Sequence, residues 1–147
     1  APLGITHAQW GSFDNGHGTD TAAHLALRSR DMARIGQLVL QQGQWQGRQL
    51  VAREWLARST REHTRINRNK PYGYLWWMDR VPAEGGAVPV VFAVGSGGQM
   101  IFVVPELALV TVFTGANFNS RKVQRTHQLL RRVAAASGRA QSPILQR

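Results

Sequence analysis

The sequence predicts an α+β fold in which helices come first, consecutive antiparallel strands follow, and one helix comes last. Apolar residues recur at helical spacing between residues 29 and 59. From residue 71 to residue 118, short apolar runs alternate with glycine and proline, as is typical of strands joined by turns. Helical spacing then returns. We expect two helices, three or four antiparallel strands, and a C-terminal helix that covers one face of the sheet.

Residues 1–28 are expected to be loop-rich, because turn-forming residues are dense there. A helix is predicted to follow, with Ser29 as its N-cap and Asp31 in the first turn, where a carboxylate suits the helix dipole. Gly43 is the expected stop, since glycine commonly follows the last turn of a helix.

A second, short helix is predicted over residues 51–59, with Trp55 and Leu56 facing the core. The aromatic segment 72–78 predicts a first strand, and the glycine-containing segment 82–86 predicts the turn after it.

Three further apolar runs predict the rest of the sheet. Strands are expected over residues 88–94, 100–104 and 107–114, with a glycine-rich interruption at residues 95–98. The last two runs are almost continuously apolar, so both of their faces should be covered. We expect the N-terminal half to supply too little cover, which is a first indication that part of the fold lies outside this chain.

The C-terminal helix is predicted over residues 120–136, with Gly138 as its stop. Its expected apolar stripe is Val123, Leu129, Leu130 and Val133. The chain as a whole is interpreted as one incomplete domain, divided into a loop and helical part (1–70), antiparallel strands (71–118), the C-terminal helix (119–137) and a tail (138–147).

Length and composition are those of a globular domain. The chain has 147 residues, of which 43% are hydrophobic, enough to bury a core. It has no apolar run of the ~18 residues that a membrane span needs, and it has no cysteine. We therefore expect no membrane span and no disulfide, and the compartment is left open between bacterial periplasm and cytoplasm.

The chain is strongly basic, with 18 Lys and Arg residues against 8 Asp and Glu, a net charge of +10. Such a charge would attract nucleic acid, anionic membrane or acidic polymers. The arginines are spread along the chain, however, and no base-stacking motif, helix-turn-helix or zinc-finger spacing accompanies them. A solvated basic face is the preferred interpretation, and nucleic acid is not an expected partner.

The most suggestive short motif is Gly95–Gln99, with the sequence Gly-Ser-Gly-Gly-Gln. It is not a nucleophile elbow, because Val94 stands two residues before Ser96 and an apolar strand follows where a helix belongs. It also lacks the lysine of a phosphate-binding loop and the last glycine of a dinucleotide fingerprint. Two interpretations are left: a tight turn or bulge, or a stretch whose backbone N–H groups face a ligand.

Metal and paired-carboxylate chemistry find no support in the sequence. The five histidines form no pair at metal-binding spacing, and the eight carboxylates are scattered. His17 with Asp14 and Asp20 could be imagined as a metal loop, but a polar surface loop is the preferred interpretation. No metal and no cofactor are predicted.

Four blocks of the sequence resemble the serine β-lactamase and penicillin-binding-protein superfamily, in that family's order. Pro2–Thr6 is similar to the phrase after its middle catalytic motif, Leu27–Leu38 to its Leu-x-x-x-Asp-Leu-Ala-Arg-Phe-Gly helix, and Tyr72–Trp77 to its Tyr-Gly-x-Gly-Trp strand. Phe92–Val112 looks like the strand beside the active site and the hairpin behind it. The resemblance is strongest to the class C β-lactamase, esterase and 6-aminohexanoate-dimer hydrolase branch. Ala23 departs from it, because Ala-His-Leu stands where relatives commonly have Gly-Gly-Leu.

The resemblance implies a β-lactamase-like fold and an acyl-enzyme hydrolase of amide, ester or β-lactam bonds. In that family, a Ser-x-x-Lys pair supplies the nucleophile and a Tyr-x-Asn or Ser-Asp-Asn motif a second proton-transfer group. Neither motif occurs here: none of the seven serines has Lys three residues later. Both lie upstream in the family. We therefore expect a C-terminal fragment that is inactive alone and whose partner is the missing N-terminal portion.

The resemblance assigns the oxyanion-hole edge to the backbone of Gly95 and Ser96, not to the Ser96 hydroxyl. Five further residues are expected to line the substrate pocket: Gly97, Gly98, Gln99, Trp76 and Trp77. The two tryptophans also fit core positions. Two other functions stay open, a non-catalytic basic binding module and a degenerate remnant of the same fold.

Overall fold

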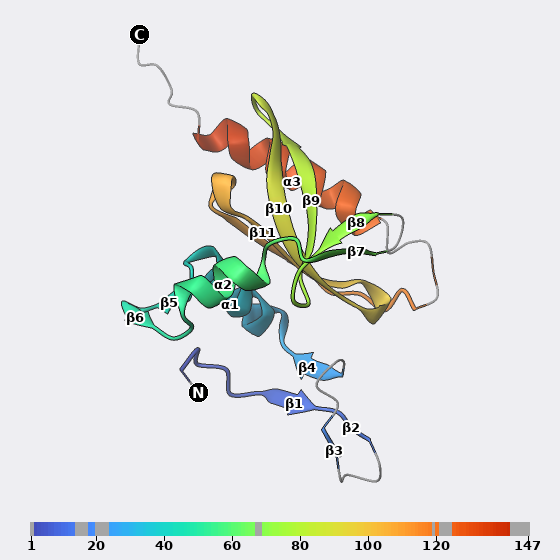
Figure 1. Cartoon of the computed structure of the whole chain (residues 1–147). Helices are drawn as coiled ribbons and strands as arrows, with labels where there is room; N and C mark the ends of the chain where they lie inside the picture. Colours follow the sequence, from blue (N-terminus) through green and yellow to red (C-terminus); the bar gives the residue numbers. More distant parts are fainter. Residues whose placement is uncertain are drawn as a thin grey trace.

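An antiparallel sheet of six strands organises the chain, and helices pack on both of its faces (Figure 1). The strand order is β12-β11-β10-β9-β8-β7, so every strand lies beside its neighbour in sequence. In the described part of the chain two helices precede the sheet and one follows it, which confirms the predicted α+β class. The computed structural model describes residues 2–13, 18–19, 24–66, 69–118, 120 and 125–141.

The sheet has more strands than the three or four that the sequence predicts. Its members are β7 (Thr64–Ile66), β8 (Lys70–Tyr72), β9 (Trp77–Ala83), β10 (Gly86–Gly95), β11 (Gln99–Val104) and β12 (Leu109–Phe113). The predicted strand over residues 72–78 is wrong, because the chain reverses between β8 and β9. There the Gly73 N–H donates to the Trp76 carbonyl oxygen at 2.8 Å, and the Tyr74 N–H donates to the Ser59 carbonyl oxygen at 2.9 Å.

Helix α1 (Ser29–Leu40) begins one residue earlier than expected. Its N-cap is Arg28, whose carbonyl oxygen accepts from the Asp31 and Met32 N–H groups, so Ser29 is the first helical residue and not the cap. The predicted stop is confirmed. Gly43 has φ +88°, and its N–H donates to the Leu38 carbonyl oxygen at 2.8 Å. A Cβ there would collide with the Val51 carbonyl oxygen, so only glycine fits.

Helix α2 (Arg53–Ser59) lies within the predicted range, but one of its two expected core residues is wrong. Leu56 is buried, whereas the Trp55 side chain is half exposed. A helix of two turns presents a narrow face to the core, and here Leu56 and Ser59 take it. Trp55 instead stacks on Tyr74 of the β8–β9 turn, with 5.7 Å between ring centroids.

Strand β11 is the centre of the core, and both of its faces are covered by this chain. Phe102 and Val104 belong to the cluster that packs under helix α3 (Arg125–Gln141), with Leu130. On the other face Ile101 lies under α1, close to Gly36. The expectation that the N-terminal half would leave this strand uncovered is therefore wrong. Gly36 lets α1 approach the sheet closely enough to cover it.

Helix α3 extends further than predicted, and its predicted apolar stripe is confirmed at Leu130 but not at Leu129 or Val133. Leu130 and Ala134 are buried, whereas Leu129 and Val133 are exposed. The helix continues through Gly138 to Gln141, so the predicted stop is wrong: a single glycine costs a helix about 1 kcal/mol, which is not enough to end it. Ser120, the predicted start, is described and is not helical, and the helix is described from Arg125. Val123 lies in residues 121–124, outside the described residues, as do residues 142–147 of the predicted tail.

The N-terminal segment contains short strands, contrary to the expectation of a loop. β1 (Ala8–Trp10) pairs with β4 (Leu25–Leu27), and β2 (Ser12–Phe13) pairs with β3 (Gly18–Thr19). A further small hairpin, β5 (Gln44–Trp45) with β6 (Arg48–Gln49), joins α1 to α2. The ribbon of β1 to β4 projects away from the six-stranded sheet (Figure 1).

Candidate functional site

The glycine-rich motif forms the tight connection between β10 and β11. Gly95 and Gln99 are the last paired residues of the two strands, and Ser96–Gly98 form a single 3-10 turn between them. Gly97 has φ +78° and Gly98 has φ +99°, a region that favours glycine. The context is strand, turn, strand, which excludes a nucleophile elbow because that motif needs a helix after the serine.

Residues that follow β12 hold the turn Ser96–Gly98 in place. The Asn117 N–H donates to the Gly97 carbonyl oxygen at 2.9 Å. The Phe118 ring lies against Gly97, where a Cβ would come within 2.7 Å of a ring carbon. Gly97 and Gly98 are buried beneath these contacts, whereas Ser96 is exposed at the tip. The backbone of the turn is therefore fixed while Ser96 is presented to its surroundings.

Gln99 fixes the same turn through its side chain. Its amide nitrogen donates to the Gly115 carbonyl oxygen, and its amide oxygen accepts from the Gly115 N–H at 3.3 Å. Both ends of the amide are thus committed to the backbone beyond β12. The sequence motif carries no signal for this role, because Gly115 is far from Gln99 along the chain.

The two predicted pocket tryptophans are both half-buried, but they take different positions. Trp77 pairs with Phe92 in the sheet and packs against the core cluster under α3, with its ring 4.7 Å from that of Tyr72. Trp76 belongs to the β8–β9 turn. By strand alternation, Trp77 faces the α3 side and Gln99 the α1 side. The structure therefore does not gather all of the predicted residues on one wall.

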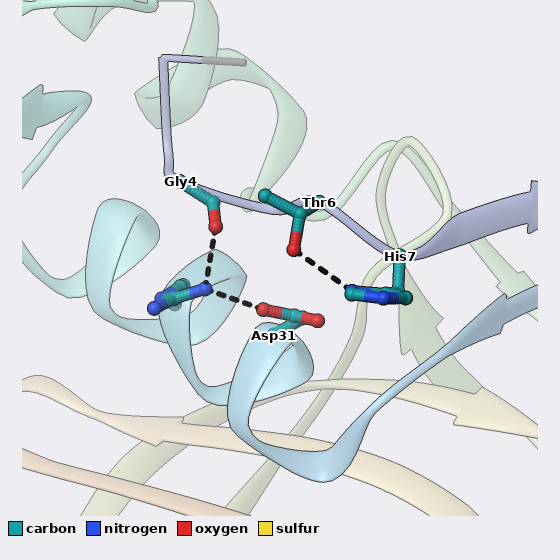
Figure 2. Close-up of polar contacts among 5 residues, drawn as sticks. Gly4, Thr6, His7 and Asp31 are labelled. Atoms are coloured by element: carbon teal, nitrogen blue, oxygen red, sulfur yellow. Dashed lines mark hydrogen bonds and ion pairs between the residues drawn. The ribbon is translucent and has the colours of Figure 1, made fainter.

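A group of polar contacts, called here the polar clamp, holds the N-terminal segment Pro2–Thr6 to helix α1. One guanidinium nitrogen of Arg34, Nη1, donates to the Gly4 carbonyl oxygen at 2.9 Å and to Asp31 Oδ1 at 2.6 Å. Figure 2 shows this arrangement on the first turn of α1, with Thr6 Oγ1 and His7 Nδ1 2.8 Å apart beside it. The buried Asp31 carboxylate orients the Arg34 guanidinium. That guanidinium in turn holds the Gly4 carbonyl group in place. The spacing of three residues between Asp31 and Arg34 indicates this ion pair in the sequence, whereas no local pattern indicates the bond to Gly4.

His127 on α3 has a pKa below the ordinary value of a histidine. Burial lowers the pKa of this imidazole, and the nearby charges of Lys70 and Arg131 lower it further, against an opposing effect of Asp79. Its ring lies edge-on to Phe92 and Phe102, with centroids 5.2 and 5.3 Å away. The His127 side chain therefore fills the space between α3 and the sheet. The neutral imidazole is favoured there because burial disfavours the charged form.

One arginine, Arg58, has an aromatic neighbour in the structure, although no base-stacking motif accompanies the arginines in the sequence. The Arg58 guanidinium lies 5.9 Å from the Tyr74 ring centroid, and the His63 ring stacks parallel to Tyr74 at 4.2 Å. Because Tyr74 already stacks on protein rings, this cluster fastens α2 to the β8–β9 turn. Among the described residues no group of three His, Asp, Glu or Cys side chains could hold a metal. Asp14, His17 and Asp20, the imagined metal loop, lie outside the described residues.

An antiparallel sheet with α3 on one face and α1 on the other, and a braced glycine turn at one end, defines a partial β-lactamase-like fold. The chain is similar to a protein designated a 6-aminohexanoate-dimer hydrolase from Bacillus anthracis, with a TM-score of 0.66, 22% identity, and coverage of 89% of this chain and 34% of that one. It is also similar to a protein designated a β-lactamase from Bacteroides dorei DSM 17855, with a TM-score of 0.57, 15% identity, and coverage of 88% and 47%.

Because both sequence identities are below 25%, these similarities show the fold alone. The chain spans about a third and about half of the length of the two solved structures. No family model and no curated protein matches the sequence. No helix among the described residues is long and apolar enough to cross a membrane.

Proposed function

We propose that this chain supplies the oxyanion-hole edge of a serine hydrolase of β-lactamase-like fold that cleaves amide, ester or β-lactam bonds through an acyl-enzyme. The observation that supports the proposal is the braced turn Ser96–Gly98 at the end of β10. An oxyanion hole needs backbone N–H groups that do not move when negative charge develops, and a turn fixed by Asn117, Gln99 and Phe118 meets that need.

The proposed donor is the Ser96 N–H, with Gly95 setting the strand end that carries it. Gly97 and Gly98 are buried under the turn, so they would act on the pocket through the backbone conformation that presents Ser96, not by direct contact with a substrate. Gln99 would act on the pocket by holding the turn, and Trp76 would wall the pocket from the β8–β9 turn. Trp77 packs against the core on the α3 side and would support that wall from behind. The nucleophile and its base would come from the portion of the fold that the longer solved structures have and this chain lacks.

The first test uses the isolated chain with nitrocefin, p-nitrophenyl esters and a fluorophosphonate probe. We expect no turnover and no labelling, because no serine is followed by Lys at the third position. Stoichiometric labelling of any serine in this chain would overturn the proposal.

The second test adds the upstream portion, expressed in trans or fused, and compares two variants at one position. Ser96→Pro removes the proposed N–H donor, while Ser96→Ala removes only the hydroxyl. Proline is compatible with the backbone, because Gly95 is extended (φ −112°, ψ 161°) and Ser96 begins a 3-10 turn.

We expect Ser96→Ala to keep most of the restored activity and Ser96→Pro to lower kcat by about 10²–10³-fold, the usual effect of removing one oxyanion donor. Equal losses in both variants would show that the hydroxyl, and not the backbone, carries the function. No restored activity with a folded complement would favour a degenerate remnant instead.

A further inference from the structure

A side chain continues the pairing of β11 and β12 at the end of the sheet that carries the glycine turn. The last backbone pair of these strands is Met100 with Phe113. Beyond that pair, the side-chain amide of Gln99 bonds to the backbone of Gly115 in place of a strand residue. Its nitrogen donates to the Gly115 carbonyl oxygen, and its oxygen accepts from the Gly115 N–H at 3.3 Å. Because both ends of the amide are used, Gly115 is fixed in position and in orientation.

Gly115 lies so close to the turn Ser96–Gly98 that a side chain at this position would be crowded. A Cβ at Gly115 would be 3.0 Å from the Gly97 carbonyl oxygen and 3.1 Å from Asn117 Nδ2. The same Gly97 oxygen accepts a hydrogen bond from the Asn117 N–H at 2.9 Å. Residues 115–118, called here the brace, therefore fix the direction of the Gly97 carbonyl group.

The turn needs this support, because its own sequence does not fix its conformation. Three of the five residues in Gly95–Gln99 are glycines, and glycine has the widest range of accessible backbone conformations. A single peptide group separates the Gly97 carbonyl group from the Ser96 N–H, so a rotation at the first changes the direction of the second. An oxyanion donor has to point correctly before the negative charge develops. The direction of the Ser96 N–H therefore depends on residues outside the motif.

We propose that Gln99 and Gly115 form a positioning pair, which directs the Ser96 N–H toward the oxyanion from outside the substrate pocket. The inference rests on the proposed hydrolase function and adds to it the contact that controls the donor. Neither member of the pair touches the substrate. Since the negative charge on the oxyanion develops only after the substrate has bound, loss of the pair lowers kcat and leaves KM nearly unchanged.

The test replaces Gln99 by glutamate, which has the same shape but can lose a proton. A protonated carboxyl group donates and accepts as the amide does, so it can restore both bonds to Gly115. An ionised carboxylate cannot donate, and one of its oxygens would face the Gly115 carbonyl oxygen. These contacts favour the neutral form and should raise the pKa of the introduced carboxyl group above its ordinary value.

The kinetics are measured with the upstream portion supplied in trans or fused. Above the raised pKa, we expect Gln99→Glu to lower kcat by about 10–10²-fold, the scale of a small misplacement of a group that takes part in the reaction. As the pH falls through this pKa, the ratio of the variant kcat to the unmodified kcat should rise toward unity. Gln99→Met loses both bonds at every pH, so its ratio should be low and independent of pH.

Gln49→Glu is the matched control. The Gln49 amide nitrogen also donates to backbone carbonyl oxygens, those of Gln42 and Val51, but it lies in the β5–β6 hairpin. The same change of charge there should leave kcat unchanged at every pH. Gly115→Ala tests the other member of the pair: its Cβ would crowd the Gly97 carbonyl oxygen, so kcat should fall by an amount that does not depend on pH.

Hydrogen exchange tests the same contact in the chain by itself, without any activity. The Gly115 and Asn117 amides donate to Gln99 and to Gly97, so both should exchange faster in Gln99→Met than in the unmodified chain, while exchange in the rest of β11 is unaffected. Unchanged exchange at both amides would show that Gln99 does not hold the brace, and the inference would fall.

The kinetic outcomes separate this inference from the proposed function. Restored activity with equal kcat in Gln99→Glu and Gln49→Glu at every pH would refute the positioning pair and leave the proposed function standing. A rise in KM without a change in kcat would mean that Gln99 binds the substrate directly, which also refutes the pair. A folded complement that restores no activity to the unmodified chain would contradict the proposed function, and the positioning pair with it.

Discussion

Two regions of the molecule are stabilised in different ways. One is the six-stranded sheet with helices α1 and α3, and the other is the N-terminal ribbon of β1 to β4. Around β11 the residues are enclosed on both faces, and Phe102, Val103 and Val104 have no exposed surface. Strand β1, by contrast, is exposed along its whole length, and the segment before it is held to α1 by the Arg34 contact with Gly4. The difference teaches that stability resides in the sheet, whereas the position of the N-terminal segment depends on a few polar contacts.

The largest expected effect comes from emptying the centre of the core. Phe102→Ala should lower the free energy of unfolding by about 3–5 kcal/mol, because it removes a fully buried ring and leaves a cavity. Chemical denaturation monitored by circular dichroism measures the change. Val94→Ala, at an exposed position on β10, is the control and should change stability by about 0.5 kcal/mol or less. Similar losses in both variants would contradict the location of the core.

The close approach of α1 to the sheet is tested at Gly36. A Cβ at this position would lie 2.5 Å from Val110 Cγ1 and 2.9 Å from Ile101 Cγ2, so Gly36→Ala should cost about 1–3 kcal/mol through overpacking. Adding Val110→Ala should make room and reduce the cost, and a double-mutant cycle measures that coupling. Strictly additive effects would show that α1 does not lie against Val110.

The buried position of His127 between α3 and the sheet should make the free energy of unfolding depend on pH. Its pKa is lowered on folding, so below the ordinary value of 6.5 the unfolded chain takes up a proton that the folded chain does not. The contribution of His127 to stability is therefore complete above pH 6.5 and is lost as the pH falls through the folded pKa. Denaturation at a series of pH values should show less of this slope in His127→Phe than in the unmodified chain. An unchanged slope would rule out His127 as its source.

The smallest expected effect on global stability comes from the clamp on the N-terminal segment. Arg34 is partly exposed, but Arg34→Met leaves the buried Asp31 carboxylate without its cation, so the change should cost about 1–2 kcal/mol. Hydrogen exchange should nevertheless become faster at residues 2–10 while the sheet is unaffected. Arg30→Met, at an exposed position on the same helix, is the matched control. Faster exchange in the sheet as well would show that the two regions are not separate.

The sequence was most informative where structure depends on neighbouring residues. The end of α1 at Gly43, the presence of α2, and the glycine turn between β10 and β11 all follow from local backbone chemistry. It was least informative where a residue contacts a distant one. The amide of Gln99 bonds to Gly115, and Arg34 bonds to Gly4; neither partner is marked by any local pattern.

The sequence by itself therefore determined the α+β class, the order of the elements and the glycine turn that carries the proposed oxyanion edge. The tertiary structure decided which faces are buried: it left Trp55 and Leu129 exposed, buried Ala134 against the sheet, and carried α3 past Gly138. The physical reason is that hydrophobic periodicity defines a face of an element, whereas its partner is selected by close packing between segments that are far apart in the chain.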